Sequence, residues 1–287
     1  MRVDGSWRTV SVHPEAGTVA LLPAELGTVD DLVRGGPDAL TAARAAAADA
    51  PERPLDVEAL GAPLTRFNRD VLCTGWNYWA HYEESTGRRE GQDPAERPRH
   101  PTFFTKGPDT VIGPYDDIRY DAQVSSKWDY EAEVALVIGR TGRSIPQEQA
   151  LEHVFGYLVA NDVSQRDLQR AHGGQWLKGK SIDDTMPIGP WLTTADEIAD
   201  PAGLRIRCAV NDTVLQDATT AQMAFPIARL IAELSWGMTL RAGDVLLTGT
   251  PSGIGNAREP QIFLNPGDVV TTSVDGLGAL RNRVVSR

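Results

Sequence analysis

The chain has 287 residues, of which 41% are hydrophobic and 23% are charged, as in ordinary globular proteins. Its 28 lysines and arginines against 39 acidic residues give a formal net charge of −11. This charge argues against nucleic acid or an anionic membrane surface as a main partner, because both are bound through clustered cations. Only Cys73 and Cys208 are cysteines, which excludes a disulfide scaffold and a cysteine-rich zinc site.

The N-terminal region predicts a small α/β domain over residues 1–66, followed by a larger domain over 67–287. The elements expected in the small domain are strands at 7–12 and 18–22, an alanine-rich helix from Pro37 to about Asp49, and a linker at 51–63. The chain start lacks the apolar run of a signal peptide, and no stretch approaches ~20 uninterrupted apolar residues. We therefore expect a cytoplasmic protein without a membrane span.

The larger domain shows short apolar runs bounded by glycine and proline, which is typical of many short strands. The expected elements are a strand at 71–74, a helix or lid at 75–84, a polar loop at 85–100, strands at 134–138 and 157–160 with a helix at 146–154 between them, a hairpin at 204–216, a helix from Pro226 to Gly237, and strands at 245–247, 269–274 and 280–285. Together they predict a β-rich α+β fold with mixed sheets.

Two glutamates, Glu131 and Glu133, run directly into the apolar strand at 134–138. If strand geometry begins by Glu131, both side chains point to one face. Carboxylates this close repel each other, which favours either a raised pKa on one of them or a hard cation such as Mg²⁺ between them. A solvated strand end is the alternative, and this motif alone leaves it open.

A third carboxylate, Asp162, follows the apolar strand at 157–160. Three carboxylate oxygens suit a Mg²⁺ site in which water or substrate fills the other positions. The alternative is that Asp162 caps the helical turn that follows it.

Polar side chains elsewhere fit chemistry beside such a cation. Lys180, in a glycine-rich stretch, would stabilise a developing oxyanion, with a plain surface lysine as the alternative. Gln169 and Arg166 fall in a run that would form one helical turn. His81 and Glu84, three residues apart, share a helix face, so the carboxylate would orient the imidazole as a general base. An ordinary exposed pair is the alternative.

A glycine-rich run, Thr248–Gly255, follows the strand at 245–247. Its backbone N–H groups can approach an anion closely. The run lacks the residue order of a phosphate-binding P-loop, and no dinucleotide-binding glycine motif follows a strand. ATP and NAD are therefore not supported as ligands.

Taken together in this order, six runs resemble the fumarylacetoacetate hydrolase family. They are Gly75–His81, Phe103–Lys106, Asp129–Val134, Asn161–Gln169, Gly179–Ser181 and Thr248–Gly255. The resemblance covers residues 71–287, and residues 1–66 match the variable N-terminal domain of the family more weakly. A charged insertion from Ser85 to His100 departs from the family pattern. Its arginines at 88, 89, 97 and 99 would either bind a distal carboxylate or be solvated.

The resemblance implies a mixed β-sandwich roll that forms a homodimer and binds Mg²⁺ or Mn²⁺, with Ca²⁺ as a further option. On the family pattern the metal ligands are Glu131, Glu133 and Asp162, the catalytic residues are His81, Glu84, Lys180 and Gln169, and the substrate contacts are Tyr78, Arg166 and Thr250.

The resemblance also implies a metal-dependent hydrolase that cleaves a C–C bond in a 1,3-dicarbonyl or acylpyruvate-type substrate through an enolate, with His81 and Glu84 activating water. The alternatives within the family are a 2-oxoacid decarboxylase and an enol–keto isomerase, of the oxaloacetate or 2-hydroxyhepta-2,4-diene-1,7-dioate type. These reactions need no attacking water. A non-catalytic binding protein that kept the fold is the alternative from another class.

Overall fold

The largest sheet has seven strands in the order β7-β6-β19-β11-β13-β15-β8 in the computed structural model, which describes residues 1–87 and 96–287. Its strands are β6 Val71–Gly75, β7 Thr102–Lys106, β8 Val111–Ile112, β11 Ala132–Ile138, β13 Val154–Asn161, β15 Met186–Thr194 and β19 Val245–Leu247. The pairs β6–β19 and β8–β15 are parallel, and the other neighbours are antiparallel, so the sheet is mixed as expected.

A second sheet of five strands, in the order β17-β16-β20-β21-β9, encloses the main hydrophobic core with the first. Its strands are β9 Ile118–Tyr120, β16 Arg205–Val210, β17 Thr213–Thr219, β20 Val269–Val274 and β21 Gly278–Ser286. Val134 and Leu136 of β11 are wholly buried in this core beside Ile206 of β16 and Leu280 of β21. Ala135 and Val137 point to the opposite face of β11 and join a second buried cluster. Because both faces are covered, this strand is apolar throughout. The strand-rich α+β prediction is confirmed.

The register of β11 and β13 places three acidic side chains together. Glu133 is paired with Ala160, and one step further along the ladder the N–H of Asp162 donates to the carbonyl of Glu131 at 2.9 Å. Directly opposed residues of antiparallel strands project from the same face of a sheet. Glu131, Glu133 and Asp162 therefore leave the sheet on one side, at one end of the two strands.

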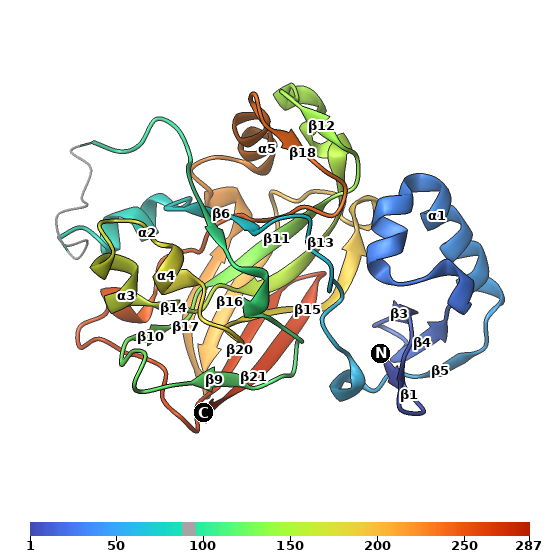
Figure 1. Cartoon of the computed structure of the whole chain (residues 1–287), viewed down its shortest axis with the longest axis horizontal. Coiled ribbons are helices and arrows are strands. Elements are labelled where there is room, and N and C mark those ends of the chain that lie inside the picture. The colour runs from blue at the N-terminus through green and yellow to red at the C-terminus, as the bar shows by residue number, and fades with distance from the viewer. Residues whose placement is uncertain (88–95) are drawn as a thin grey trace.

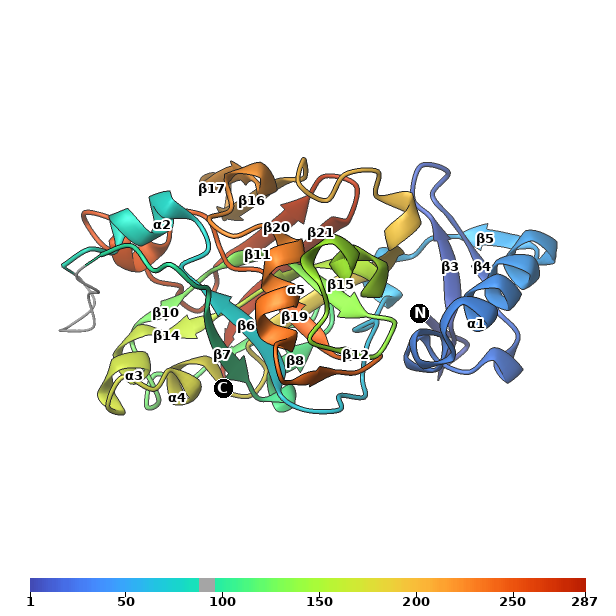
Figure 2. The ribbon, with the colours of Figure 1, turned by 90° about the horizontal axis from the view of Figure 1, so that it is seen from above.

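Three short helices lie at this end of the molecule, as both ribbon views show (Figures 1 and 2). They are α2 Trp79–Glu84, α3 Arg166–Ala171 and α4 Leu177–Lys180. The strand pair β10 Trp128–Asp129 and β14 Ser164–Gln165 leads into this region. A longer helix, α5 Ile227–Ser235, begins after Pro226 and buries Leu230 and Ile231 in the main core. A small pair, β12 Gly142–Arg143 and β18 Thr239–Leu240, lies near α5.

The N-terminal unit lies at the opposite end of the molecule from α2, α3 and α4 (Figures 1 and 2). It consists of the short pair β1 Arg2–Val3 and β2 Ser6–Trp7, the sheet β3 Val10–His13, β4 Thr18–Leu21 and β5 Glu52–Pro54, and the helix α1 Val29–Asp49. The division into domains 1–66 and 67–287 stays a prediction. Among the described residues, no helix combines the length and apolar character that crossing a membrane requires.

Several local predictions were wrong or incomplete. Helix α1 begins at Val29 rather than Pro37, because Thr28 and Asp31 form a reciprocal capping box, and Gly36 at φ 65° kinks the helix. The expected strand at 7–12 is broken between β2 and β3, and the expected linker at 51–63 contains β5 at the sheet edge. The helix expected at 146–154 is a 3₁₀ helix, Gln147–His153.

Candidate active site

Three carboxylates form the centre of the site. Oxygen atoms of Glu131, Glu133 and Asp162 all lie within 4.8 Å of one another, and each side chain is at most 6% exposed. Glu133 also accepts the backbone N–H of Gly249 at 2.6 Å, which ties the carboxylate to the glycine-rich run. Burial of three like charges this close is costly unless cations compensate them.

Two buried lysines supply part of that compensation. The Nζ of Lys180, on α4, lies 2.6 Å from both Glu131 Oε2 and Asp162 Oδ2 and so bridges two of the three carboxylates. The Nζ of Lys106, at the end of β7, lies 2.9 Å from Asp162 Oδ1 and also donates to the carbonyl of Val163 at 2.8 Å. Asp162 therefore has a cation on each oxygen.

The charges divide unevenly among the three acids. Burial would raise the pKa of Glu131, but Lys180 and Arg166 hold that pKa well below its ordinary value. Burial raises the pKa of Glu133 well above its ordinary value, and repulsion from Asp162 and Glu131 raises it further. Burial would lower the pKa of Lys180, but the Asp162 and Glu131 carboxylates raise it. Glu133 is thus the acid whose negative charge is least compensated.

The cluster fits a divalent ion. Three carboxylates from two adjacent strand ends offer the oxygen ligands that hard cations such as Mg²⁺ prefer. The under-compensated charge at Glu133 is the electrostatic reason for a cation beyond the two lysines. The alternatives of a solvated strand end and a helix cap do not describe these residues, because all three acids are buried and Asp162 lies between two lysines.

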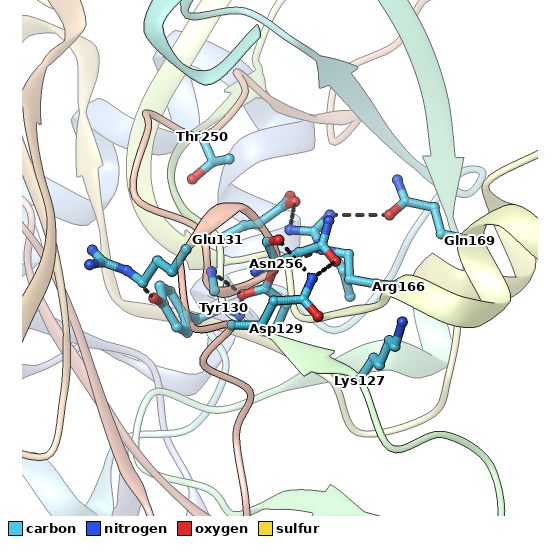
Figure 3. Close-up of polar contacts among 12 residues, drawn as sticks. Lys127, Asp129, Tyr130, Glu131, Arg166, Gln169, Thr250 and Asn256 are labelled. Atoms are coloured by element: carbon cyan, nitrogen blue, oxygen red, sulfur yellow. Dashed lines mark hydrogen bonds and ion pairs between the residues drawn. The ribbon is translucent and has the colours of Figure 1, made fainter. Parts of the chain in front are cut away.

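Arg166, at the start of α3, forms a fork behind this cluster. Its Nη2 lies 2.6 Å from Glu131 Oε1, its Nε donates to Asp129 Oδ2 at 2.8 Å, and its Nη1 donates to Gln169 Oε1 at 3.1 Å. Figure 3 shows Arg166 between Gln169 on one side and Asp129 and Glu131 on the other. Arg166 is only 4% exposed, so these partners fix the orientation of its guanidinium.

His81 and Glu84, on α2, form the pair that the sequence suggested. His81 Nδ1 lies 2.9 Å from Glu84 Oε1, and the imidazole is buried at the pocket wall. The other carboxylate oxygen, Glu84 Oε2, accepts the N–H of Gly253 at 2.7 Å. This arrangement directs the Nδ1 proton to the carboxylate and leaves Nε2 as the nitrogen that can accept a proton.

A pocket lies over the carboxylates and is walled by aromatic rings on one side. Trp76 and Trp176 meet edge to face with ring centroids 5.0 Å apart, and Phe104 lies 5.2 Å from Trp176. The Trp176 ring covers Gly75 so closely that a β-carbon there would lie 2.5 Å from it. Trp76 adopts φ 54°, a backbone region that bulky residues rarely occupy. Polar residues also line the pocket: Arg166, Gln169, Lys180 and Asn256.

A comparison with protein families agrees with these observations. The family model for the C-terminal domain of fumarylacetoacetate (FAA) hydrolase matches residues 70–285. The chain belongs to the fumarylacetoacetate hydrolase family. Enzymes of this family generally use a divalent metal, in line with the acidic cluster at Glu131, Glu133 and Asp162.

Similar proteins narrow the comparison. The mitochondrial oxaloacetate tautomerase Fahd2a of Rattus norvegicus is 41% identical over 264 residues, which cover 92% of this chain and 81% of the relative. The oxaloacetate tautomerase YisK of Bacillus subtilis is 41% identical over 225 residues, which cover 78% of this chain and 72% of the relative. The solved structure of the fumarylacetoacetate hydrolase of Exiguobacterium antarcticum has a TM-score of 0.85 and 36% identity, over 100% of this chain and 98% of that one.

Of the three expected substrate contacts, Tyr78 and Thr250 do not present a free hydroxyl to the pocket as a substrate contact would. Tyr78 precedes α2, is 2% exposed and does not line the pocket, and its hydroxyl has no hydrogen-bond partner among the described residues. Thr250 does line the pocket, but its hydroxyl donates to the carbonyl of Ala132 at 2.9 Å and accepts from Gln216 at 2.8 Å. The roles of Tyr78 and Thr250 stay predictions, as does the homodimer.

Several residues of the site are not predicted by the sequence pattern. Lys106 ends the family run Phe103–Lys106, but nothing in that run predicts that its ammonium is buried against Asp162. Trp76, Trp176 and Asn256 line the pocket without any local pattern that predicts it. Within the insertion, Arg88 and Arg89 lie outside the described residues, and Arg97 pairs with Glu83 at the surface.

Proposed function

We propose that this protein is a divalent-metal-dependent tautomerase that interconverts the enol and keto forms of a 2-oxoacid of the oxaloacetate type. The observation that carries the proposal is the buried carboxylate cluster of Glu131, Glu133 and Asp162 facing a pocket with cationic and amide donors. The two oxaloacetate tautomerases at 41% identity support this reaction over the C–C hydrolysis that the family resemblance first suggested.

The charge balance of the site suits an acidic substrate. Asp129, Glu131, Glu133 and Asp162 would carry four negative charges when ionised, and Lys106, Lys180 and Arg166 carry three positive charges. A bound divalent ion would turn the net charge of this buried group from −1 to +1. A positive pocket attracts a dicarboxylate and stabilises the enolate oxyanion that forms when the carbon next to the 2-oxo group loses a proton.

Glu131, Glu133 and Asp162 would hold the metal, with Mg²⁺ or Mn²⁺ as the expected ion and Ca²⁺ as a further option. When bound, such an ion polarises the substrate oxygens and lowers the free energy of enolate charge. The ammonium of Lys180 contacts Glu131 and Asp162, so it would hold its protons close to substrate oxygens bound at this cluster. Arg166 fixes the Gln169 amide at the pocket, where its NH₂ group can donate to substrate.

His81 is the residue that moves the proton at carbon. Tautomerisation removes a proton from the enol oxygen and adds one to the adjacent carbon, and the reverse direction removes it again, without water and without C–C cleavage. His81, held by Glu84 at 2.9 Å, has one nitrogen committed to the carboxylate and the other available for this transfer.

The second candidate is hydrolytic cleavage of a C–C bond in an acylpyruvate-type substrate. The His81–Glu84 contact favours it, because the same oriented imidazole can activate a water molecule. The similar solved structure from Exiguobacterium antarcticum is named as a fumarylacetoacetate hydrolase. Decarboxylation of oxaloacetate would use the same enolate and the same carboxylate cluster.

An ultraviolet assay with product analysis separates these reactions. The protein is incubated with enol oxaloacetate, with Mg²⁺ or with EDTA, and the loss of enol absorbance is followed. Accelerated loss that requires metal, with keto oxaloacetate as the product, supports the tautomerase. Release of CO₂ with pyruvate indicates a decarboxylase, and cleavage of an acylpyruvate indicates a hydrolase. An unaccelerated rate with every substrate contradicts the proposal.

A further inference from the structure

Asp129 is the most extensively bonded buried carboxylate next to the site, and the proposed reaction does not use it. It ends β10, two residues before Glu131, and is 0% exposed. Asp129 is not one of the described residues that line the pocket. An isolated buried carboxylate is strongly unfavourable, so the groups that surround Asp129 account for its presence.

Four donors surround this carboxylate, two on each oxygen. Oδ1 accepts the backbone N–H groups of Gly255 at 2.7 Å and Tyr130 at 2.9 Å. Oδ2 accepts the backbone N–H of Asn256 at 2.9 Å and the Nε–H of Arg166 at 2.8 Å. The negative charge is thus both paired and fully hydrogen-bonded.

These donors come from two parts of the site that are far apart in sequence. Arg166 extends from Asp129 to Glu131 and Gln169, so its fork reaches the carboxylate cluster and the pocket lining. Gly255 ends the glycine-rich run and Asn256 follows it, and Asn256 lines the pocket. Figure 3 shows Asp129 beneath Asn256 and next to Arg166.

The backbone of the 253–256 loop is built to reach Asp129. A β-carbon on Gly255 would lie 1.7 Å from the carbonyl oxygen of Ile262 and 2.8 Å from Asp129 Oδ1. Only glycine therefore allows the loop to approach the carboxylate at this point. The N–H of Ile262 donates back to the carbonyl of Gly255 at 3.1 Å, which holds the loop closed against Asp129.

From this geometry we infer that Asp129 is a positioning residue for the proposed reaction. Its carboxylate orients the Arg166 guanidinium, which in turn positions the Gln169 amide. The same carboxylate holds the backbone of the 253–256 loop, which positions Asn256 at the substrate. This role rests on the proposed function for its kinetic readout, but the contacts of Asp129 can be tested without it.

Asp129→Asn is the decisive variant. Asparagine has one oxygen and one NH₂ group, and each carboxylate oxygen of Asp129 accepts two N–H donors. Whichever way the amide is turned, its NH₂ faces two donors, so either the Gly255 and Tyr130 contacts or the Asn256 and Arg166 contacts are lost. Asp217→Asn is the matched control, because the exposed Asp217 forms a bidentate pair with Arg205 on the surface.

Three measurements are made on both variants: kcat and KM with oxaloacetate, the Kd of Mg²⁺, and the Kd of oxalate, a dicarboxylate that resembles the enol, for the Mg²⁺-loaded protein. We expect Asp129→Asn to lower kcat/KM and to weaken oxalate binding by about 10- to 100-fold, the usual effect of losing such a support, with a smaller loss of Mg²⁺ affinity because the Arg166 fork also holds Glu131. Asp217→Asn should match the parent protein. A folded Asp129→Asn protein with parental oxalate affinity and kcat/KM would overturn the inference and leave Asp129 with a structural role only.

Hydrogen exchange covers the case in which Asp129→Asn does not fold. In the parent protein the amide hydrogens of Gly255 and Asn256 should exchange slowly, because Asp129 binds both. Fast exchange at both amides in the folded parent protein would overturn the inference. If the parent protein lacks tautomerase activity, the proposed function fails, whereas oxalate binding and hydrogen exchange still decide the role of Asp129.

Discussion

The carboxylate of Glu84 joins helix α2 to the backbone of Gly253. Glu84 Oε2 accepts the Gly253 N–H at 2.7 Å, while Oε1 lies 2.9 Å from His81 Nδ1. The imidazole is therefore positioned from a loop that also borders the substrate pocket, rather than from its own helix alone. Movement of α2 away from that loop would separate the His81 imidazole from the carboxylate cluster.

Replacing His81 with alanine should lower the tautomerisation kcat by about 10²- to 10⁴-fold, the range for loss of a general acid–base group. The Kd for Mn²⁺ should not change, because His81 is not one of the three clustered acids. Stopped-flow absorbance and titration calorimetry measure the two quantities. His100→Ala is the matched control, since His100 forms the same kind of pair with Glu233 on the surface. Parental kcat in His81→Ala would remove His81 from the proton-transfer role.

Replacing Glu133 with glutamine should weaken Mn²⁺ binding, because it replaces one of three carboxylates with a neutral amide and removes the charge that is least compensated by lysines. A loss of about 10-fold or more in affinity is expected, equivalent to about 1.4 kcal/mol. Electron paramagnetic resonance of free Mn²⁺ gives the Kd. Glu152→Gln, at an exposed pair with Arg140, serves as the control. Equal Kd values for Glu133→Gln and the control would show that the metal assignment is wrong.

Replacing Lys106 with methionine should destabilise the protein by about 3–5 kcal/mol, the cost of removing one partner of a buried ion pair. Methionine keeps most of the volume but leaves Asp162 Oδ1 without its ammonium partner. Urea unfolding of the metal-free protein measures the change. Lys178→Met, at an exposed position on α4, should change the stability little. A Lys106→Met protein as stable as this control would mean that Lys106 does not compensate Asp162.

Replacing Trp176 with leucine should widen substrate choice, because the Trp176 ring packs against Trp76, Phe104 and Gly75 at the pocket wall. The ratio of kcat/KM for a longer 2-oxoacid to that for oxaloacetate should rise by about 10-fold or more, since filling a pocket is worth about 1–3 kcal/mol per methylene-sized difference. Trp236→Leu, 84% exposed, is the control. An unchanged ratio would mean that the aromatic wall does not limit substrate length.

The sequence allowed prediction of what depends on strand alternation. Glu131 and Glu133 are two residues apart where the apolar run 134–138 begins, so their common face could be expected before any coordinates. Asp162 could be expected only at the end of a second apolar strand, because its place beside the two glutamates depends on the register of β11 and β13. The α+β class and the helix after Pro226 follow from similarly local patterns. Pro37 does not mark the start of α1, because the Thr28–Asp31 capping box begins the helix eight residues earlier and Pro37 follows the kink at Gly36.

The remaining parts of the site depend on long-range contacts. Lys106 reaches Asp162 across 56 positions of sequence, and Asp129 meets Gly255 across 126. No local period encodes such pairs, because they arise only when β7, β10 and the 253–256 loop pack around the same strand ends. The family run places Tyr78 at the substrate; its side chain is buried and is not among the described pocket-lining residues, and its role stays a prediction.

The ladder between β11 and β13 has an evolutionary consequence. Deleting or inserting one residue in either strand would turn its acidic end into the hydrocarbon interior and expose its valines or leucines where the acids stood. Such a change would cost both folding and catalysis in one event. Length variation in descendants of this protein should therefore be confined to the connections, and these two strands should tolerate only substitutions that keep their length.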